Sequence, residues 1–187
     1  MRLTPLRKDD LTGERLELFE AMVDRSVGRD ESFVFDEQGY VRGPFNPLLH
    51  HPRSGVVLKD MAAVLRFSGV LPAAAREAVI LVVAAFWREG HEWWAHEHVA
   101  RAAGITDDEL VEMHERRPAT FADPVTRAAH DAAFAIVHRG DLTDEEHAAA
   151  RAALSEEELV EVTVLIGYYA LLSMQLHVFR VPTPHTF

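Results

Sequence analysis

The chain has no cysteine among its 187 residues. A protein without cysteine forms no disulfide, offers no thiolate to a metal ion and supports no thiol-based redox reaction. Clusters of Lys and Arg are also missing, since acidic residues outnumber basic ones by 30 to 19 and the formal net charge is −11. Because nucleic-acid phosphates are bound by clustered Lys and Arg, we expect no nucleic-acid partner.

Long apolar segments are also absent from the sequence. The N-terminal stretch is polar and charged, MRLTPLRKDDLTGERLEL, so we expect no signal peptide and a cytoplasmic protein. The longest apolar run extends from Val164 to Met174 and lies between Glu161 and His177. This run is shorter than the roughly 20 residues that span a bilayer. We therefore expect no membrane partner and a buried helix at this position.

Helix-start signals occur along most of the chain. Three capping boxes, in which a hydroxyl residue precedes a glutamate by three positions, are Thr106 with Glu109, Thr143 with Glu146, and Ser155 with Glu158. Two further starts pair a capping side chain with a proline at the first helical position, Asp123-Pro124 and Asn46-Pro47. Together with Pro72 and the apolar periodicity, these signals predict helices at 12–27, 46–51, 54–68, 72–88, 91–103, 106–116, 124–139, 143–153 and 156–178.

The remaining pattern predicts an all-α protein with a single domain over 1–187. Only the stretch 32–45, rich in aromatic and turn residues, has an extended pattern, and one such segment makes no sheet. The segments 72–88 and 156–178 are apolar on almost every face, which is typical of helices surrounded by other helices. We expect Gly167 to permit the close approach of a neighbour. These two helices predict a bundle core, or an oligomer built around it.

The densest group of chemically active side chains is in residues 88–98, REGHEWWAHEH. His91-Glu92 followed by His96 superficially suggests the zinc-protease pattern H-E-x-x-H, but the two histidines are five residues apart rather than four. On a helix this spacing separates them by about 140°, so they cannot hold one ion. Because a closed site needs three or four convergent ligands and no third ligand is evident, we predict no metal site.

A helical wheel divides this stretch into two faces. Glu89, Glu92 and His96 fall with Trp93 within an arc of about 120°, the width of an inward face. His91 and His98 lie on the opposite side. The wheel therefore predicts that an acid and an imidazole, one turn apart, occupy core positions, and that His91 and His98 face outward.

Glu77 presents a similar case on the preceding helix. It lies well inside the helix that begins near Pro72, on the face shared by Ile80 and Leu81. A buried carboxylate costs several kcal/mol unless it is paired, and histidine is the partner that we expect, because a carboxylate can hold and orient an imidazole. From the residues alone two interpretations stay open. The group is an acid–base site, or it is a charge at a helix N-terminus beside a structural core histidine.

Three segments together resemble the carboxymuconolactone decarboxylase family, over about residues 40–182. They are GPFNPLLHHP (43–52), LPAAAREAVILVVAAFWREGHEWWAHEHVARAAGI (71–105) and LIGYYALLSMQLHVFRVP (165–182), with 1–40 as an N-terminal helix and an extended lead-in. The most specific element is Glu77 followed by Glu92 and His96. The resemblance implies an alkylhydroperoxidase-D-like helical bundle, usually a homo-oligomer (dimer, trimer or hexamer).

Within that superfamily the thiol peroxidase branch uses a glutamate, a C-x-x-C pair and a histidine. The resemblance places Glu89 and Glu92 where those cysteines would stand, and the lack of cysteine excludes thiol peroxidase chemistry. Two positions depart from the family pattern, His98, where a proline or small residue is expected, and His177, where a polar amide is common. These departures leave the identity of the substrate open.

The resemblance implies cofactor-independent decarboxylation of a small lactone or keto acid. In this hypothesis His96 donates a proton to carbon, Glu92 positions or shares that proton, and Glu77 orients the pair. The same chemistry needs neither a metal nor an organic cofactor, because the electrons left by carbon dioxide delocalise into the unsaturated substrate.

Three further residues are candidates for substrate binding, Arg76, Arg88 and Trp93. Either arginine can hold a substrate carboxylate, although arginines at helix ends are more often solvated. Two alternative functions remain: another proton transfer in the same pocket, such as isomerisation or lactone hydrolysis, and a non-catalytic helical oligomer that binds a small acid. Production of carbon dioxide distinguishes the first hypothesis from both.

Overall fold

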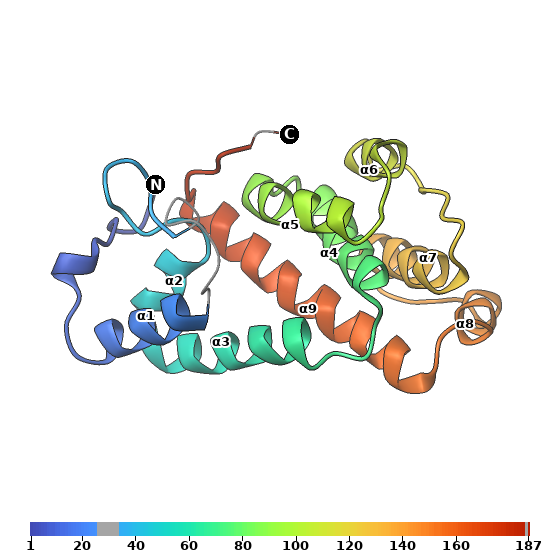
Figure 1. The fold of residues 1–187 in the computed structure, drawn as a ribbon, viewed down its shortest axis with the longest axis horizontal. Coiled ribbons are helices and arrows are strands. Elements are labelled where there is room, and N and C mark those ends of the chain that lie inside the picture. The colour runs from blue at the N-terminus through green and yellow to red at the C-terminus, as the bar shows by residue number, and fades with distance from the viewer. Residues whose placement is uncertain (26–33, 186) are drawn as a thin grey trace. The chain divides into compact units, whose positions relative to one another are not determined.

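The computed structural model describes residues 1–25, 34–185 and 187 (Figure 1). Within these residues every regular element is a helix, which confirms the all-α class. The elements, in chain order, are η1 (Lys8–Asp10), α1 (Glu14–Arg25), α2 (Phe45–His50), α3 (Pro52–Phe67), α4 (Ala73–Trp87), α5 (Gly90–Ala102), α6 (Asp107–His114), α7 (Pro124–Arg139), α8 (Asp144–Arg151) and α9 (Glu156–Phe179).

The chain divides into two compact units. The first contains Met1–Gly69 with Met174–Thr183, and the second contains Val70–Ser173 with Pro184–Phe187. That the two units form the single domain predicted over 1–187 stays a prediction. The candidate residues 76–96 all lie in the second unit.

The first unit is built from α1, α2 and α3, which pack on one another. Its core contains apolar side chains from all three helices and from the segments beside them, among them Leu18, Phe19 and Leu49. At Gly55 on α3, a Cβ atom would overlap Leu18 and the backbone of Leu48. A glycine is therefore required at this crossing, because any side chain would push α1 and α3 apart.

The segment predicted to be extended contains no strand among its described residues, 34–45. It forms turns and two isolated bridges, Arg7 with Tyr40 and Phe35 with Val41; residues 32 and 33 lie outside the described residues. Helix α2 already begins at Phe45, because Pro44 has a helical backbone (φ −66°, ψ −18°). Asn46 is therefore inside the helix and fully buried, and the prediction that it caps this helix is wrong.

In the second unit α4 is the central helix and packs against α5, α6 and α7. Its residues are buried almost without interruption from Glu77 to Ala85, as the all-round apolar pattern predicted. Helix α7 in turn packs against α8. The sequence AAAREAVILVVAAFW therefore forms the core of this unit because it presents small and branched apolar side chains on every face.

Four of the predicted helix starts are formed by the side chains that signalled them. Thr106 and Thr143 each make a reciprocal capping box, and Ser155 exchanges both bonds with Glu158. Asp123 caps α7 by accepting the backbone N–H of Thr126 at 2.8 Å. Because each cap satisfies amides that the first turn leaves without partners, the observed helix starts lie within about two residues of the predicted ones. Residues 26 and 27 of the first predicted helix lie outside the described residues.

Helix α9 (Glu156–Phe179) agrees with the helix predicted at 156–178 and extends beyond the apolar run Val164–Met174 at both ends. Among the described helices it alone is long and apolar enough to cross a membrane, although half of its most apolar stretch is buried and core helices of soluble proteins meet the same criterion. Gly167 does not serve the predicted close approach within the chain, because a Cβ atom there would meet nothing within 4 Å. Gly167 instead lies on an exposed part of α9, as does Leu171.

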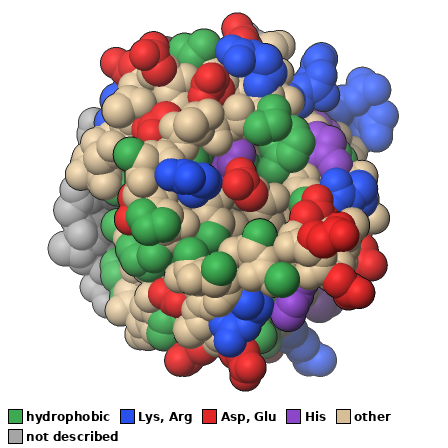
Figure 2. Space-filling model, turned by 90° about the vertical axis from the view of Figure 1, so that its right-hand side faces the viewer, with side chains coloured by type: hydrophobic (Ala, Val, Ile, Leu, Met, Phe, Trp, Pro, Cys, Tyr) green, Lys and Arg blue, Asp and Glu red, His purple; other side chains and the backbone are tan. Residues whose placement is uncertain are grey.

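Charged side chains of both signs are interspersed on the face shown in Figure 2. Lys and Arg side chains are scattered among Asp and Glu there, with histidines between them. Such a mixed surface produces no extended positive field. The absence of a nucleic-acid partner stays a prediction.

Candidate functional site

The candidate site begins at the turn that joins α4 to α5. Arg88 ends α4 in the left-handed conformation (φ 51°), and the N–H of Glu89 then donates to the carbonyl of Ala84 at 2.8 Å. The Glu89 side chain caps α5 by accepting the N–H of Glu92 at 2.7 Å. These bonds fix where α5 starts and therefore which of its residues face α4.

The packing of α5 on α4 brings Glu77 to His96, nineteen positions along the chain. His96 Nδ1 lies 2.7 Å from Glu77 Oε2, and His96 Nε2 lies 3.8 Å from Glu92 Oε2. Glu77 and Glu92 are each 3% exposed and His96 is 7% exposed. The structure thus confirms that the three side chains are buried and converge, and that histidine is the partner of Glu77.

Arg76 is the fourth charged group at this cluster. Its Nε donates to Glu77 Oε1 at 3.3 Å, so both oxygens of the carboxylate have a partner. Burial raises the pKa of the Glu77 carboxyl, but the hydrogen bond and charge of His96 and the guanidinium of Arg76 outweigh burial and leave this pKa below its ordinary value of 4.5. Glu77 is therefore ionised at neutral pH.

An ionised Glu77 determines which nitrogen of His96 can take part in chemistry. Nδ1–H donates to the carboxylate, which fixes the orientation of the ring. Nε2 is then directed toward Glu92 and is the atom that can give or take a proton. The ring of Tyr169, from α9, meets that of His96 edge-on, with centroids 5.2 Å apart, and forms an aromatic wall beside the imidazole. This carboxylate–imidazole–carboxylate arrangement is suited to general acid–base catalysis.

Solved structures establish the fold. A protein from Ralstonia eutropha JMP134, described as an alkylhydroperoxidase AhpD core and an uncharacterized peroxidase-related protein, superposes with a TM-score of 0.75. The match covers 97% of this chain and 91% of that chain, at 14% identity. The chain has the AhpD-like fold.

Two other solved structures agree with this fold. A protein of unknown function from Agrobacterium tumefaciens, whose description carries the name AhpD, has a TM-score of 0.65 at 19% identity over 76% of this chain and 99% of that chain. The debrominase Bmp8 has a TM-score of 0.69 at 17% identity over 96% of this chain and 90% of that chain. No family model and no curated protein matches the chain. The similarity to these structures confirms the AhpD-like fold, whereas membership of the carboxymuconolactone decarboxylase family stays a prediction.

The three predicted substrate-binding residues occupy different places in the second unit. Arg76 joins the cluster through Glu77. Arg88 is exposed at the end of α4, eleven residues from Glu77, or about 16 Å along a helix. Trp93 is buried, and its indole N–H donates to Glu97 at 2.8 Å, while its ring contacts His114. Only Arg76 is brought to the carboxylate–imidazole cluster by a contact seen in the structure.

The prediction that His91 faces outward is wrong. His91 is 2% exposed, and its ring lies 5.6 Å from that of Trp94. The wheel fails here because the whole first turn of α5, residues 90–93, is buried, so this turn has no solvent face. His98, two turns beyond His91, is exposed as predicted. Among the described residues, no group of three or more His, Asp or Glu side chains is placed to hold a metal ion.

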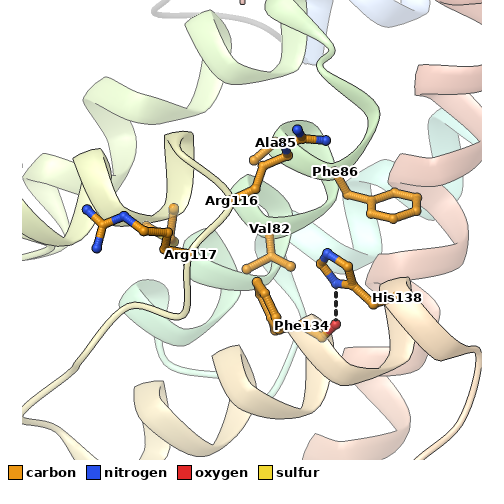
Figure 3. Close-up of a pocket in the computed structure, with 8 residues that line it drawn as sticks. Val82, Ala85, Phe86, Arg116, Arg117, Phe134 and His138 are labelled. Atoms are coloured by element: carbon orange, nitrogen blue, oxygen red, sulfur yellow. Dashed lines mark hydrogen bonds between the residues drawn. The ribbon is translucent and has the colours of Figure 1, made fainter.

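Three cavities in the second unit lie away from Glu77, Glu92 and His96. One of about 550 Å³ lies between the starts of α4 and α7 and the α5–α6 turn, and one of about 420 Å³ lies between α7 and α8. The third, about 10 Å³, is lined by Phe86, Phe134 and His138 and holds no more than one water (Figure 3). There, His138 donates from Nδ1 to the carbonyl of Phe134 at 2.7 Å, and the guanidinium of Arg117 points away from this group. The small cavity is therefore a structural void.

Proposed function

We propose that this protein is a cofactor-independent acid–base enzyme that decarboxylates a small lactone or keto acid. The observation that carries the proposal is the buried chain of contacts from Glu77 to His96 to Glu92, with separations of 2.7 and 3.8 Å. An imidazole held by one ionised carboxylate and facing another is a proton carrier with a defined direction.

The reaction would proceed through loss of carbon dioxide and a single proton transfer. Cleavage of the bond between the carboxylate carbon and its neighbour leaves an electron pair, which delocalises into the adjacent carbonyl or conjugated lactone. That carbon then accepts a proton from Nε2 of His96, and the imidazole is reprotonated from water, with Glu92 as the nearest carboxylate to the transferred proton. Glu77 stays ionised throughout and holds Nδ1–H, so the ring keeps its orientation.

Arg76 is the best-supported residue for holding the substrate carboxylate. Its Nε is bound to Glu77 and its side chain is 18% exposed, and the terminal guanidinium nitrogens provide the parallel donors that a carboxylate accepts. Desolvation of the substrate carboxylate beside the buried cluster would favour its departure as neutral carbon dioxide. Arg88 and Trp93 have weaker support as binding residues, because one lies at the far end of α4 and the other packs against His114.

The AhpD-like neighbours support a small unsaturated substrate. The debrominase Bmp8 has also been solved as a cysteine-to-alanine variant in complex with 2,3,4-tribromopyrrole, and this structure matches with a TM-score of 0.67 at 18% identity over 97% of this chain and 91% of that chain. A flat ring of that size is comparable to an unsaturated lactone. Because the present chain has no cysteine, its reaction would proceed by proton transfer and not through a thiolate.

The test is a screen of small lactones, β-keto acids and peroxides that records carbon dioxide release. For a responsive substrate we expect His96→Gln and Glu92→Gln to lower kcat at least a hundredfold, the lower end of the usual contribution of general acid–base catalysis. His98→Gln is the matched control, since His98 is exposed on the same helix. If both site variants kept decarboxylation within a factor of two of the parent, the assigned roles would be wrong.

The same screen separates the alternatives. Turnover without carbon dioxide indicates isomerisation or lactone hydrolysis by the same imidazole. Stabilisation by a small acid with no turnover of any compound indicates a binding protein.

A further inference from the structure

A group of aromatic rings connects the C-terminal segment to α5 and α6. Phe187 stacks on His114 with centroids 4.5 Å apart and an interplanar angle of 10°. Trp93 meets both rings edge-on, at 4.9 Å from His114 and 5.5 Å from Phe187. His185 lies 5.5 Å from Phe187, also edge-on. His185 and Phe187 therefore pack on a platform made by Trp93 and His114.

The polar link in this group is a pair of imidazoles. His114 Nε2 lies 3.3 Å from His185 Nε2. Two such nitrogens make a hydrogen bond only when one carries a proton and the other a lone pair, so at least one ring must be neutral. When both rings are protonated, the bond is lost and two positive charges face each other at the same distance.

The charged groups that face His114 come from each element around it. His185 approaches from the C-terminal segment; Glu97 faces His114 from α5, and Glu115 directly follows α6. Burial lowers the pKa of His114, the charge of His185 lowers it further, and Glu97 and Glu115 oppose this shift only in part. Both glutamates are already engaged, Glu97 with Trp93 and Arg101, and Glu115 with Arg117.

We propose that His185 and Phe187 form a pH-dependent latch, which is closed on Trp93 and His114 at neutral pH and is released when both imidazoles are protonated. The direction of the pH dependence follows from the lowered pKa of His114 in the closed state. The latch is fully closed above about pH 6.5, the ordinary pKa of histidine, and opens as the pH falls below this value. Release removes the ring contact of Phe187 with Trp93, which is next to Glu92 on α5.

Phe187 can be followed by NMR in the whole chain with selectively labelled phenylalanine and histidine. At pH 7.5 the Phe187 ring should show shifts from the ring currents of His114 and Trp93. Between pH 7.5 and 5.0 these shifts should collapse toward those of an unstructured phenylalanine, together with the titration of His114. A repulsion on the order of 1 kcal/mol, the value for two charges at about 4 Å in water, corresponds to at least a fivefold fall in the ratio of closed to open latch.

His114→Gln is the decisive variant. A glutamine side chain can donate to or accept from His185 in either protonation state and carries no charge, so its latch should stay closed at pH 5.0. His98→Gln, on the exposed face of α5, should behave as the parent. If His114→Gln is unfolded by far-UV circular dichroism, His185→Gln replaces it, because His185 lies in the terminal segment. Phe187 shifts that do not change with pH in the parent, or that change equally in the glutamine variant, would overturn the proposal. No substrate is needed, so its outcome is independent of the proposed function.

Discussion

The buried pair of Glu77 and His96 predicts a strong energetic coupling. Their bond of 2.7 Å joins side chains that are 3% and 8% exposed, so solvent screens it little. Glu77→Met and His96→Phe replace each side chain by an apolar one of similar volume. Either change alone leaves a buried polar partner behind, which costs about 1 to 3 kcal/mol, and more if that partner stays charged. We expect each single variant to lose about 2 to 3 kcal/mol of unfolding free energy.

The double variant should lose much less than the sum of the two single losses. Because neither Glu77 nor His96 is then left buried without the other, we expect a coupling energy of about 2 kcal/mol at pH 7, measured by urea unfolding of the parent and the three variants. The pKa of Glu77 is below 4.5, so the coupling is complete above pH 4.5 and is lost as the pH falls through the lower native value. If the loss in the double variant equals the sum of the two single losses within about 0.5 kcal/mol at pH 7, Glu77 and His96 do not act as a pair.

Three further predictions concern other parts of the chain. Arg88→Gly should raise the unfolding free energy by about 1 kcal/mol, because Arg88 is held at φ 51° and glycine adopts this conformation without strain; lower stability in urea would contradict this. Asp123→Ala should cost about 1 kcal/mol at neutral pH, because it removes the cap of α7. The backbone and hydroxyl of Thr126 lower the pKa of Asp123, so thermal melts of parent and variant should converge as the pH falls below 3.8, and equal melts at pH 7 would contradict the cap. Leu171→Glu, on the exposed part of α9, should dissociate the expected homo-oligomer in sedimentation, whereas Val111→Glu on α6 should not; an unchanged mass would exclude this face as the contact.

The helices could be predicted from the sequence because their determinants are local. Thr106 and Thr143 each bond within three residues of themselves, and a cap of this kind needs no knowledge of the rest of the chain. The central position of α4 was equally readable, since its apolar residues cover every face. Asn46 shows where local signals fail: a proline two residues earlier already has a helical backbone, so the potential cap becomes a buried helical residue.

The centre of the candidate site could also be predicted, whereas its surroundings could not. A glutamate at a core position of α4 required a partner, and a histidine one helix away supplied it. The capping role of Glu89 has a local signal, a carboxylate three residues before Glu92 at the start of α5. The contact of Phe187 with Trp93 joins residues 94 positions apart and has no local signature. His91 is buried by neighbours that the wheel does not include.

The central claim is that Nε2 of His96 delivers a proton to carbon after carbon dioxide leaves. The most direct measurement uses a responsive lactone or keto acid in D2O, in which the carbon dioxide released and the deuterium at the former carboxylate-bearing carbon are measured together for the parent and for His96→Gln. We predict one deuterium per carbon dioxide in the parent, delivered to one face of the carbon, and loss of both turnover and facial selectivity in His96→Gln. Unchanged carbon dioxide release with the same facial selectivity in His96→Gln would contradict the account.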